Sequence, residues 1–284
     1  LCHWGSKGFR HMIISNQPNA LSLEPFEKFN LLPLSFSRIS KFINDLPGFY
    51  LSYIHGYKGA SCSMERGTWA EFGVKLLFEG KDMRDALYIA EQQYDQAVEE
   101  KNLQEDPKRK VERDNLPLYI KGFWKELRQY QLYDFQERLE HDILGVPVIG
   151  YTDFGLIAPQ IPPDQSEDHY FKVDLKSSGR MPTILSHSIN LQQMFYAKVS
   201  NVENRVLYSV VSKGSKSAKT KWFTISNDPS YQKMFEDMIV ALHGFLSSCE
   251  DQEDMKKKIV PNLDDWIWSY DPQVTNVRKE VWGY

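Results

Sequence analysis

The sequence predicts an α/β protein in which a mostly helical N-terminal lobe precedes a strand-rich core. Helical apolar spacing dominates the chain before Gly145, whereas period-2 and continuous apolar runs begin directly after it. The predicted elements after Gly145 follow the order strand, strand, strand, helix, strand, strand, helix. This order favours an α/β core with a helical lobe.

Apolar spacing and terminal residues predict the helices of the N-terminal lobe. A Ser-rich cap begins the first helix, Pro47 ends it, and Gly80 closes a later one. The charged stretch 101–117 indicates a loop. The predicted helices cover residue 34 to Pro47, 48–57, 66–80, 82–100 and 119–143, the last with the aromatic residues Trp124, Tyr130, Tyr133 and Phe135.

The rest of the chain divides into a strand-rich core and a tail. We predict strands at 146–151, 153–158, 169–175, 205–212 and 220–225, and helices at 186–201 and about 229–248. The expected organisation is an extension at 1–33, one domain at 34–250 and a tail at 251–284; the domain comprises a helical lobe (34–145) and a core (146–250). Met12 is a candidate natural start, which would place residues 1–11 before the native chain.

Composition excludes several classes of protein. With 42% hydrophobic and 25% charged residues, the 284-residue chain is expected to be globular, and no apolar run is long enough to span a membrane. Its three cysteines are far apart, which fits a reducing compartment and argues against a Cys-based zinc or iron–sulfur site. The net charge of −4 counts mildly against a nucleic-acid partner, although carboxylates gathered around cations lower the formal charge too.

Two acids and a lysine are predicted to converge on neighbouring strands. Asp174 and Lys176 are two residues apart in one strand and therefore share a face, and Asp153 follows the strand in "VIGYTD". Carboxylates held together repel each other unless a divalent cation neutralises them, and hard oxygen ligands suit Mg²⁺ or Mn²⁺. A plain salt bridge within the common Asp-x-Lys tripeptide is the alternative.

The segments "GYTD" and "VDLK" resemble the G-x-x-D … (D/E)-x-K signature of the PD-(D/E)xK nuclease superfamily. Within it, the chain is similar to the RecB-type exonuclease branch, which includes CRISPR-associated exonucleases and the nuclease domains of helicase–nuclease repair complexes. That branch also carries Q-x-x-x-Y, matched here by Gln192 and Tyr196 at helical i, i+4 spacing. The resemblance covers roughly residues 34–225 and implies a restriction-endonuclease-like central mixed sheet that is flanked by helices.

Two departures from the family pattern are informative. In "RGTWAE", Glu71 stands where the branch has a metal-binding His, and a carboxylate suits Mg²⁺ or Mn²⁺ equally well. A solvent-facing helix Glu is the alternative. Several relatives hold an iron–sulfur cluster through four cysteines, but here Leu46 precedes Pro47 and only Cys249 lies in the C-terminal third. The resemblance therefore implies the type without an iron–sulfur cluster.

The resemblance also implies a role for each site residue. One or two ions of Mg²⁺ or Mn²⁺ would be held by carboxylates and a backbone carbonyl, while a lysine would position the attacking water. Gln192 would hold the nucleotide or support the metal site, and Tyr196 would contact the phosphate backbone or a base. The implied metal ligands are Glu71, Asp153, Asp174 and the Leu175 carbonyl, and the implied catalytic residues are Glu71, Asp153, Asp174 and Lys176.

Basic residues near the motifs are candidate contacts to DNA. Arg180 follows the lysine strand, and Lys213 and Lys216 lie in the Gly/Ser-rich loop 212–222, which is otherwise a solvated turn. The aromatic content of 13% fits either base stacking or core packing. The motif "WIWSYDP" in the tail is a candidate for a docked tail, a protein-partner motif or a DNA wedge.

The expected function is that of a metal-dependent DNA exonuclease in repair, recombination or phage DNA processing. The expected partner is DNA, as single strands or duplex ends, and the expected location is the cytoplasm of a bacterium or of a phage-infected host. Two alternatives stay open: a structure-specific or restriction-like endonuclease of the same superfamily, and a non-catalytic DNA-binding protein with the same fold.

Overall fold

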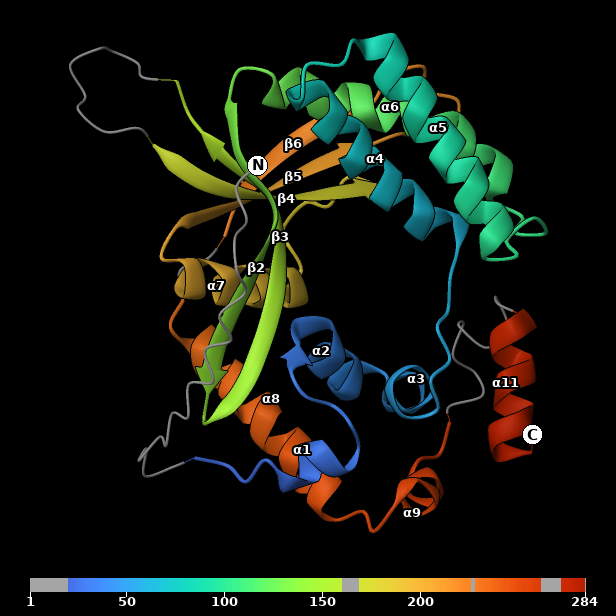
Figure 1. The fold of residues 1–284 in the computed structure, drawn as a ribbon, viewed down its shortest axis with the longest axis vertical. Coiled ribbons are helices and arrows are strands. Elements are labelled where there is room, and N and C mark those ends of the chain that lie inside the picture. The colour runs from blue at the N-terminus through green and yellow to red at the C-terminus, as the bar shows by residue number, and fades with distance from the viewer. Residues whose placement is uncertain (1–19, 160–168, 226–227, 262–271, 284) are drawn as a thin grey trace, which may run out of the picture.

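The protein folds around a central mixed sheet that is flanked by helices, as predicted (Figure 1). The computed structural model describes residues 20–159, 169–225, 228–261 and 272–283. Within them the six-stranded sheet has the order β1-β3-β4-β5-β6, with β2 also paired to β3. The strands are β1 (Leu34–Ser35), β2 (Gln131–Ile143), β3 (Val146–Ile157), β4 (Tyr170–Ser178), β5 (Glu203–Val210) and β6 (Lys219–Thr224).

Strand directions are mixed. β3 pairs antiparallel with β2 and β4, and parallel with the short β1. β4 and β5 run parallel, and β6 returns antiparallel to β5. Because β4 and β5 are parallel, their C-terminal ends meet at one edge of the sheet.

The helices group at the two ends of the long β2–β3 hairpin. Figure 1 shows α4, α5 and α6 around one end of the sheet, and α1, α2, α7 and α8 around the other. The described helices are α1 (Glu24–Lys28), α2 (Phe36–Asn44), α3 (Leu46–Phe49), the π-helix η1 (Tyr50–Ile54), α4 (Cys62–Phe78), α5 (Met83–Glu100), α6 (Arg109–Leu127), α7 (His187–Ser200), α8 (Ser230–Ser247), α9 (Gln252–Lys258) and α11 (Pro272–Trp282). None of these described helices is both long and apolar enough to cross a membrane.

Two hydrophobic clusters fill the interior. The first, here the α8 core, joins α1, α2, α7 and α8 to the start of β3 through Val146 and Val148. The second, the α4 core, joins α4, α5 and α6 to the end of β3 through Phe154 and Leu156. The middle of β3 therefore lies where the two cores meet.

Several predicted elements are confirmed at their expected positions. α5, α7 and α8 match the helices predicted at 82–100, 186–201 and about 229–248. Ser186 caps the N-terminus of α7, and its side chain accepts a hydrogen bond from the backbone N–H of Ile189. The strands predicted at 146–151 and 153–158 form one continuous strand, β3.

The helix predicted at 119–143 is confirmed only as far as Leu127, where α6 ends, and is wrong beyond it. Residues from Gln131 to Ile143 form β2, which pairs with β3 along its whole length. Leu144 and Gly145 both adopt positive φ angles, of 53° and 78°, and close a two-residue hairpin between the strands. Pairing with β3 overrides the helical spacing of the segment.

The aromatic residues placed on that helix are consequently separated. Trp124 lies on α6, whereas Tyr133 and Phe135 lie on β2. The loop predicted at 101–117 is shorter than expected, because α6 already begins at Arg109. On that helix Arg113 pairs with Glu91 at 2.9 Å and with the carboxylate of a second α5 residue, so this side chain stabilises helix packing.

Some predictions fall outside the described residues. Residues 1–11 and Met12 lie there, as does most of "WIWSYDP", at 262–271. Inside the described part, Phe26 and Leu31 of the expected extension and Met255 of the expected tail are fully buried in the α8 core. The domain boundaries themselves stay a prediction.

Candidate active site

The candidate site lies where β3 and β4 part. The last residue pair between these strands is Phe154 with Val173. One residue beyond it, Asp153 Oδ2 accepts a hydrogen bond of 2.7 Å from the backbone N–H of Leu175. Because the N–H and C=O of one strand residue point toward the same neighbouring strand, the Leu175 carbonyl faces the same side as Asp153.

Asp174 and Lys176 form a close ion pair on one face of β4, as their spacing predicts. Lys176 Nζ lies 2.6 Å from Asp174 Oδ2, and Asp174 is only 4% exposed. Burial alone would lower the pKa of Lys176, but the carboxylates of Asp174 and Asp153 outweigh it and raise this pKa. The lysine is therefore held in its charged form beside the acids.

Glu71 enters the same site from α4. Burial, reinforced by the negative charges of Asp153 and Asp174, raises the pKa of Glu71 to about 9. Burial and the charge of Asp174 likewise raise the pKa of Asp153 to about 7. The structure thus brings together Glu71, Asp153, Asp174 and Lys176, which the sequence places on three separate elements.

These acids supply the type of ligand that a cation site needs, although they are not positioned as the ligands of one ion. Among the described residues, no three His, Cys, Asp or Glu side chains already form a group that could hold a metal ion. Burial raises the pKa values of Glu71 and Asp153, and the negative charge of Asp174 raises both further, so negative charge accumulates at this position. Hard oxygen donors with unneutralised charge suit Mg²⁺ or Mn²⁺.

Metal-free protein should lose stability as the pH rises. Because the folded-state pKa values of Glu71 and Asp153 exceed their ordinary values near 4, the folded chain binds more protons than the unfolded chain above about pH 4. Stability should therefore fall between about pH 4 and 7 for Asp153, and on to about pH 9 for Glu71. Urea unfolding in EDTA at pH 5, 7 and 9 measures this slope.

The matched variants are Glu71→Gln and Asp153→Asn, which cannot titrate. Asp153→Asn should reduce the loss of stability between about pH 4 and 7, and Glu71→Gln should reduce the loss that continues to about pH 9. A native chain whose stability is unchanged or rises over this range would contradict the shared burial of the acids.

Gln192 and Tyr196 reach the site from α7. Gln192 Nε2 donates a hydrogen bond of 3.0 Å to the Tyr196 hydroxyl. Tyr196 is 4% exposed, and this burial raises the pKa of its hydroxyl. The hydrogen bond from Gln192 lowers this pKa, and the charges of Asp174 and Asp153 raise it. The ring packs against Gly150, where an added Cβ would lie 2.2 Å from Tyr196 Cε1. The glycine of "GYTD" is thus required by the tyrosine of the helix motif.

Gly150→Ala should displace the Tyr196 ring. The added methyl group overpacks the α8 core and should cost about 1–3 kcal/mol in the free energy of unfolding. Gly179→Ala is the matched control, because a Cβ there meets nothing within 4 Å. Thermal melting of both variants tests the prediction, and equal melting temperatures would refute the close packing.

The predicted phosphate contacts lie at the edge of the sheet where β4 and β5 end. Arg180 is exposed, and its backbone forms a turn with Ser178. Lys213 and Lys216 are also exposed, in the turn between β5 and β6. The hydrogen bonds and ion pairs of the described residues do not connect these three side chains to the carboxylates.

A buried network that the sequence did not reveal ties α4 and α6 to the end of β4. Arg66 on α4 forms an ion pair of 2.6 Å with Glu112 on α6, and both side chains are at most 10% exposed. Arg66 Nη2 also donates to the Ser177 carbonyl at 3.0 Å, and the Tyr119 hydroxyl donates to the Ser178 carbonyl at 2.8 Å. This Arg66 network (Arg66, Glu112, Tyr119, Ser177 and Ser178) fixes α4, which carries Glu71, against the strand that carries Lys176.

Comparisons with known proteins bear on the fold. No family model and no curated protein matches the chain by sequence. A crystal structure of a protein from Eubacterium rectale, provisionally named an exonuclease, is similar over 90% of this chain and 97% of that chain, with a TM-score of 0.50 and 12% identity. The two chains therefore share a fold. A second structure, of the protein SSO0001, covers 72% of this chain and 84% of its own, at 12% identity and a TM-score of 0.29.

Proposed function

We propose that the chain is a Mg²⁺- or Mn²⁺-dependent deoxyribonuclease that hydrolyses phosphodiester bonds from DNA ends. The observation that carries this proposal is the meeting of Glu71, Asp153 and Asp174 with Lys176 where β3 and β4 part. The fold shared with the Eubacterium rectale protein, which is provisionally named an exonuclease, supports it.

The proposed chemistry relies on charge and positioning. A cation held by Glu71, Asp153, Asp174 and the Leu175 carbonyl would supply Lewis acidity and neutralise charge on the scissile phosphate. Asp153 is oriented by the N–H of Leu175, so its carboxylate is fixed before any ligand arrives.

Lys176 is the proposed group that acts on water and phosphate. The pKa of Lys176 is raised, so its ammonium keeps its charge. The side chain is only partly buried, so it can face a substrate. From there it would orient the attacking water and offset the negative charge that develops in the transition state. Gln192 would support the site through the Tyr196 hydroxyl.

DNA is the proposed substrate, in repair, recombination or phage DNA processing. Arg180, Lys213 and Lys216 would contact phosphates, because they are exposed at the edge next to the end of β4. Such contacts make binding weaken as salt rises.

A digest of two substrates tests the proposal. The purified chain with Mn²⁺ should release nucleotides from linear single-stranded or duplex DNA and leave a covalently closed circular single strand intact. EDTA should stop the reaction. Linearisation of the circle would instead identify an endonuclease, and metal-independent DNA binding without any cleavage would identify a non-catalytic protein.

A further inference from the structure

A row of three side chains extends from Lys176 across the sheet, where β4, β5 and β6 lie side by side (Figure 1). The register pairs Lys176 with Tyr208 of β5, and Tyr208 with Lys221 of β6. Because residues directly opposite each other on paired strands share a face, this Lys176 row (Lys176, Tyr208 and Lys221) lies on the face that also carries Asp174. Neighbouring strands are about 4.8 Å apart, so the row spans about 10 Å from β4 to β6.

Tyr208 places a hydroxyl group beside the ion pair of the candidate active site. Its ring packs edge-on against Phe223, with the ring centroids 5.4 Å apart, and the residue is 8% exposed. Burial raises the pKa of the hydroxyl, the charge of Lys176 lowers it and that of Asp174 raises it, so both charged groups lie near the hydroxyl. The hydroxyl is accessible to solvent, and no described residue forms a hydrogen bond with it. It is therefore free to donate to a ligand.

Lys221 ends the row with a positive charge that no described acid neutralises. The side chain is exposed on β6, and no carboxylate of the described residues forms an ion pair with it. Its Nζ lies 4.3 Å from the centroid of the Phe223 ring and donates a hydrogen bond of 3.2 Å to the Thr183 carbonyl. Because Phe223 shares a face of β6 with Lys221, these contacts hold the ammonium on the face of the Lys176 row.

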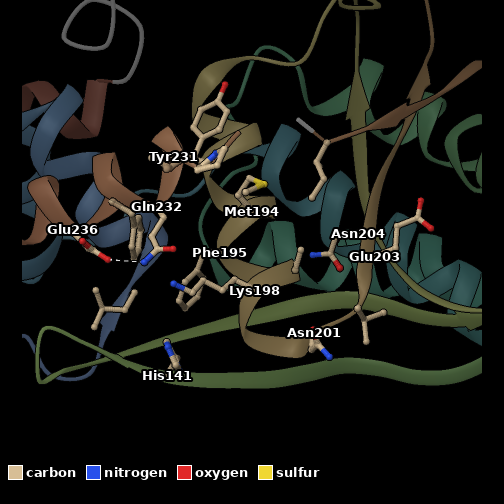
Figure 2. Close-up of a pocket in the computed structure, with 17 residues that line it drawn as sticks. His141, Met194, Phe195, Lys198, Asn201, Glu203, Asn204, Tyr231, Gln232 and Glu236 are labelled. Atoms are coloured by element: carbon tan, nitrogen blue, oxygen red, sulfur yellow. Dashed lines mark hydrogen bonds between the residues drawn. The ribbon is translucent and has the colours of Figure 1, made fainter. Parts of the chain in front are cut away.

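A cavity of about 690 Å³ between α7, α8 and the β2–β3 hairpin is a less suitable place for a nucleic-acid strand (Figure 2). Its walls are mainly apolar, and Figure 2 shows the carboxylates of Glu203 and Glu236 among its lining residues, together with Lys198. The phosphates of a nucleic acid are bound by cations, so carboxylates repel them. The Lys176 row, which carries two lysines, suits such a strand better.

We propose that the Lys176 row is the path of the DNA strand next to the bond that is cleaved. The Tyr208 hydroxyl would donate a hydrogen bond to the phosphate beside the scissile one, and Lys221 would pair with a phosphate farther along. At about 3.4 Å for each nucleotide of one strand, the row corresponds to about three nucleotides. Such contacts hold the strand but do not read its sequence. The proposal rests on the proposed nuclease function, because Lys176 anchors the row at the scissile phosphate.

The kinetics of nucleotide release from end-labelled linear DNA in Mn²⁺ test the two contacts. Tyr208→Phe removes only the hydroxyl, and Lys221→Met removes only the charge. Each should raise KM about 10-fold and leave kcat within about twofold, because the contact is the same in the ground state and the transition state. Salt separates the two variants: the slope of log KM against log salt should fall by about 0.7–0.9 in Lys221→Met and stay unchanged in Tyr208→Phe.

Substrates with one neutral methylphosphonate linkage locate the phosphate that Tyr208 contacts. In the native chain, a neutral linkage within about three nucleotides of the cleaved bond should raise KM about 10-fold, whereas one far from the ends should not. In Tyr208→Phe, one of these positions should lose its effect, because the hydroxyl and the phosphate oxygen contribute one shared interaction. A structural effect of the substitution alone would leave the sensitivity unchanged at every position and would overturn the contact.

Tyr88→Phe and Lys121→Met are the matched controls and should keep the native KM. Both residues are exposed, on α5 and α6, and these helices belong to the α4 core on the opposite face of the sheet. If the native chain cleaves DNA and KM is unchanged in both Tyr208→Phe and Lys221→Met, the path along the Lys176 row is overturned and the nuclease proposal stands. If the native chain cleaves no DNA, both proposals are overturned.

Discussion

Asp174→Asn should reduce metal-dependent DNA hydrolysis by at least about 10³-fold while the chain stays folded. The substitution keeps the shape of the side chain but removes the charge that pairs with Lys176 at 2.6 Å and that would hold the cation. Loss of one preorganised charge in a buried site commonly costs about 10²–10³-fold, and the loss of a metal ligand adds to it. Single-turnover release of nucleotides from end-labelled DNA in Mn²⁺ measures the effect.

Asp237→Asn is the matched control. Asp237 also pairs with a lysine, Lys233, at 2.8 Å, but both side chains are exposed on α8. Its substitution should leave the rate within about twofold, because exposed ion pairs contribute little. Undiminished hydrolysis by Asp174→Asn would show that the β4 carboxylate is not part of the reaction.

Arg66→Met should destabilise the chain by about 3–5 kcal/mol, because it leaves the buried Glu112 carboxylate without its cation. It also removes the hydrogen bonds from α4 to the carbonyl and hydroxyl of Ser177. The midpoint of urea unfolding measures the loss. On the exposed surface of α5, Arg84→Met is the control and should change stability by no more than about 0.5 kcal/mol.

The double variant Arg66→Met/Glu112→Leu distinguishes stability from positioning. Replacing both partners of a buried ion pair by apolar side chains is often close to neutral, so much of the stability should return. Mn²⁺ affinity, measured by calorimetry, should stay reduced, because α4 is no longer held against the end of β4. Full recovery of the affinity would mean that the Arg66 network serves folding alone.

The parts of the site that depend on local periodicity could be predicted from the sequence. The period of two in a strand correctly places Asp174 and Lys176 on one face, and the i, i+4 spacing in α7 correctly places Gln192 beside Tyr196. The meeting of these residues with Glu71 depends on packing between elements. It was expected only through the resemblance to a nuclease family.

Features that depend on distant pairing could not be predicted in this way. β2 has helical apolar spacing, and only its partner β3 makes it a strand. Arg66 contacts Glu112 and Ser177, which are 46 and 111 positions away along the chain. The sequence around Arg66 does not indicate these partners. The requirement for Gly150 likewise becomes clear only when the Tyr196 ring is seen against it.

The course of β3 through both cores has a consequence for unfolding. Its first half belongs to the α8 core and its second half to the α4 core, and Asp153 lies close to the transition. Glu71 comes from the α4 side and Tyr196 from the α8 side, so a ligand at the site requires both cores to be folded. The free energy of ligand binding then stabilises both cores against unfolding. A ligand bound at the candidate site would therefore couple the unfolding of the two cores, so that the two halves of the molecule unfold more cooperatively.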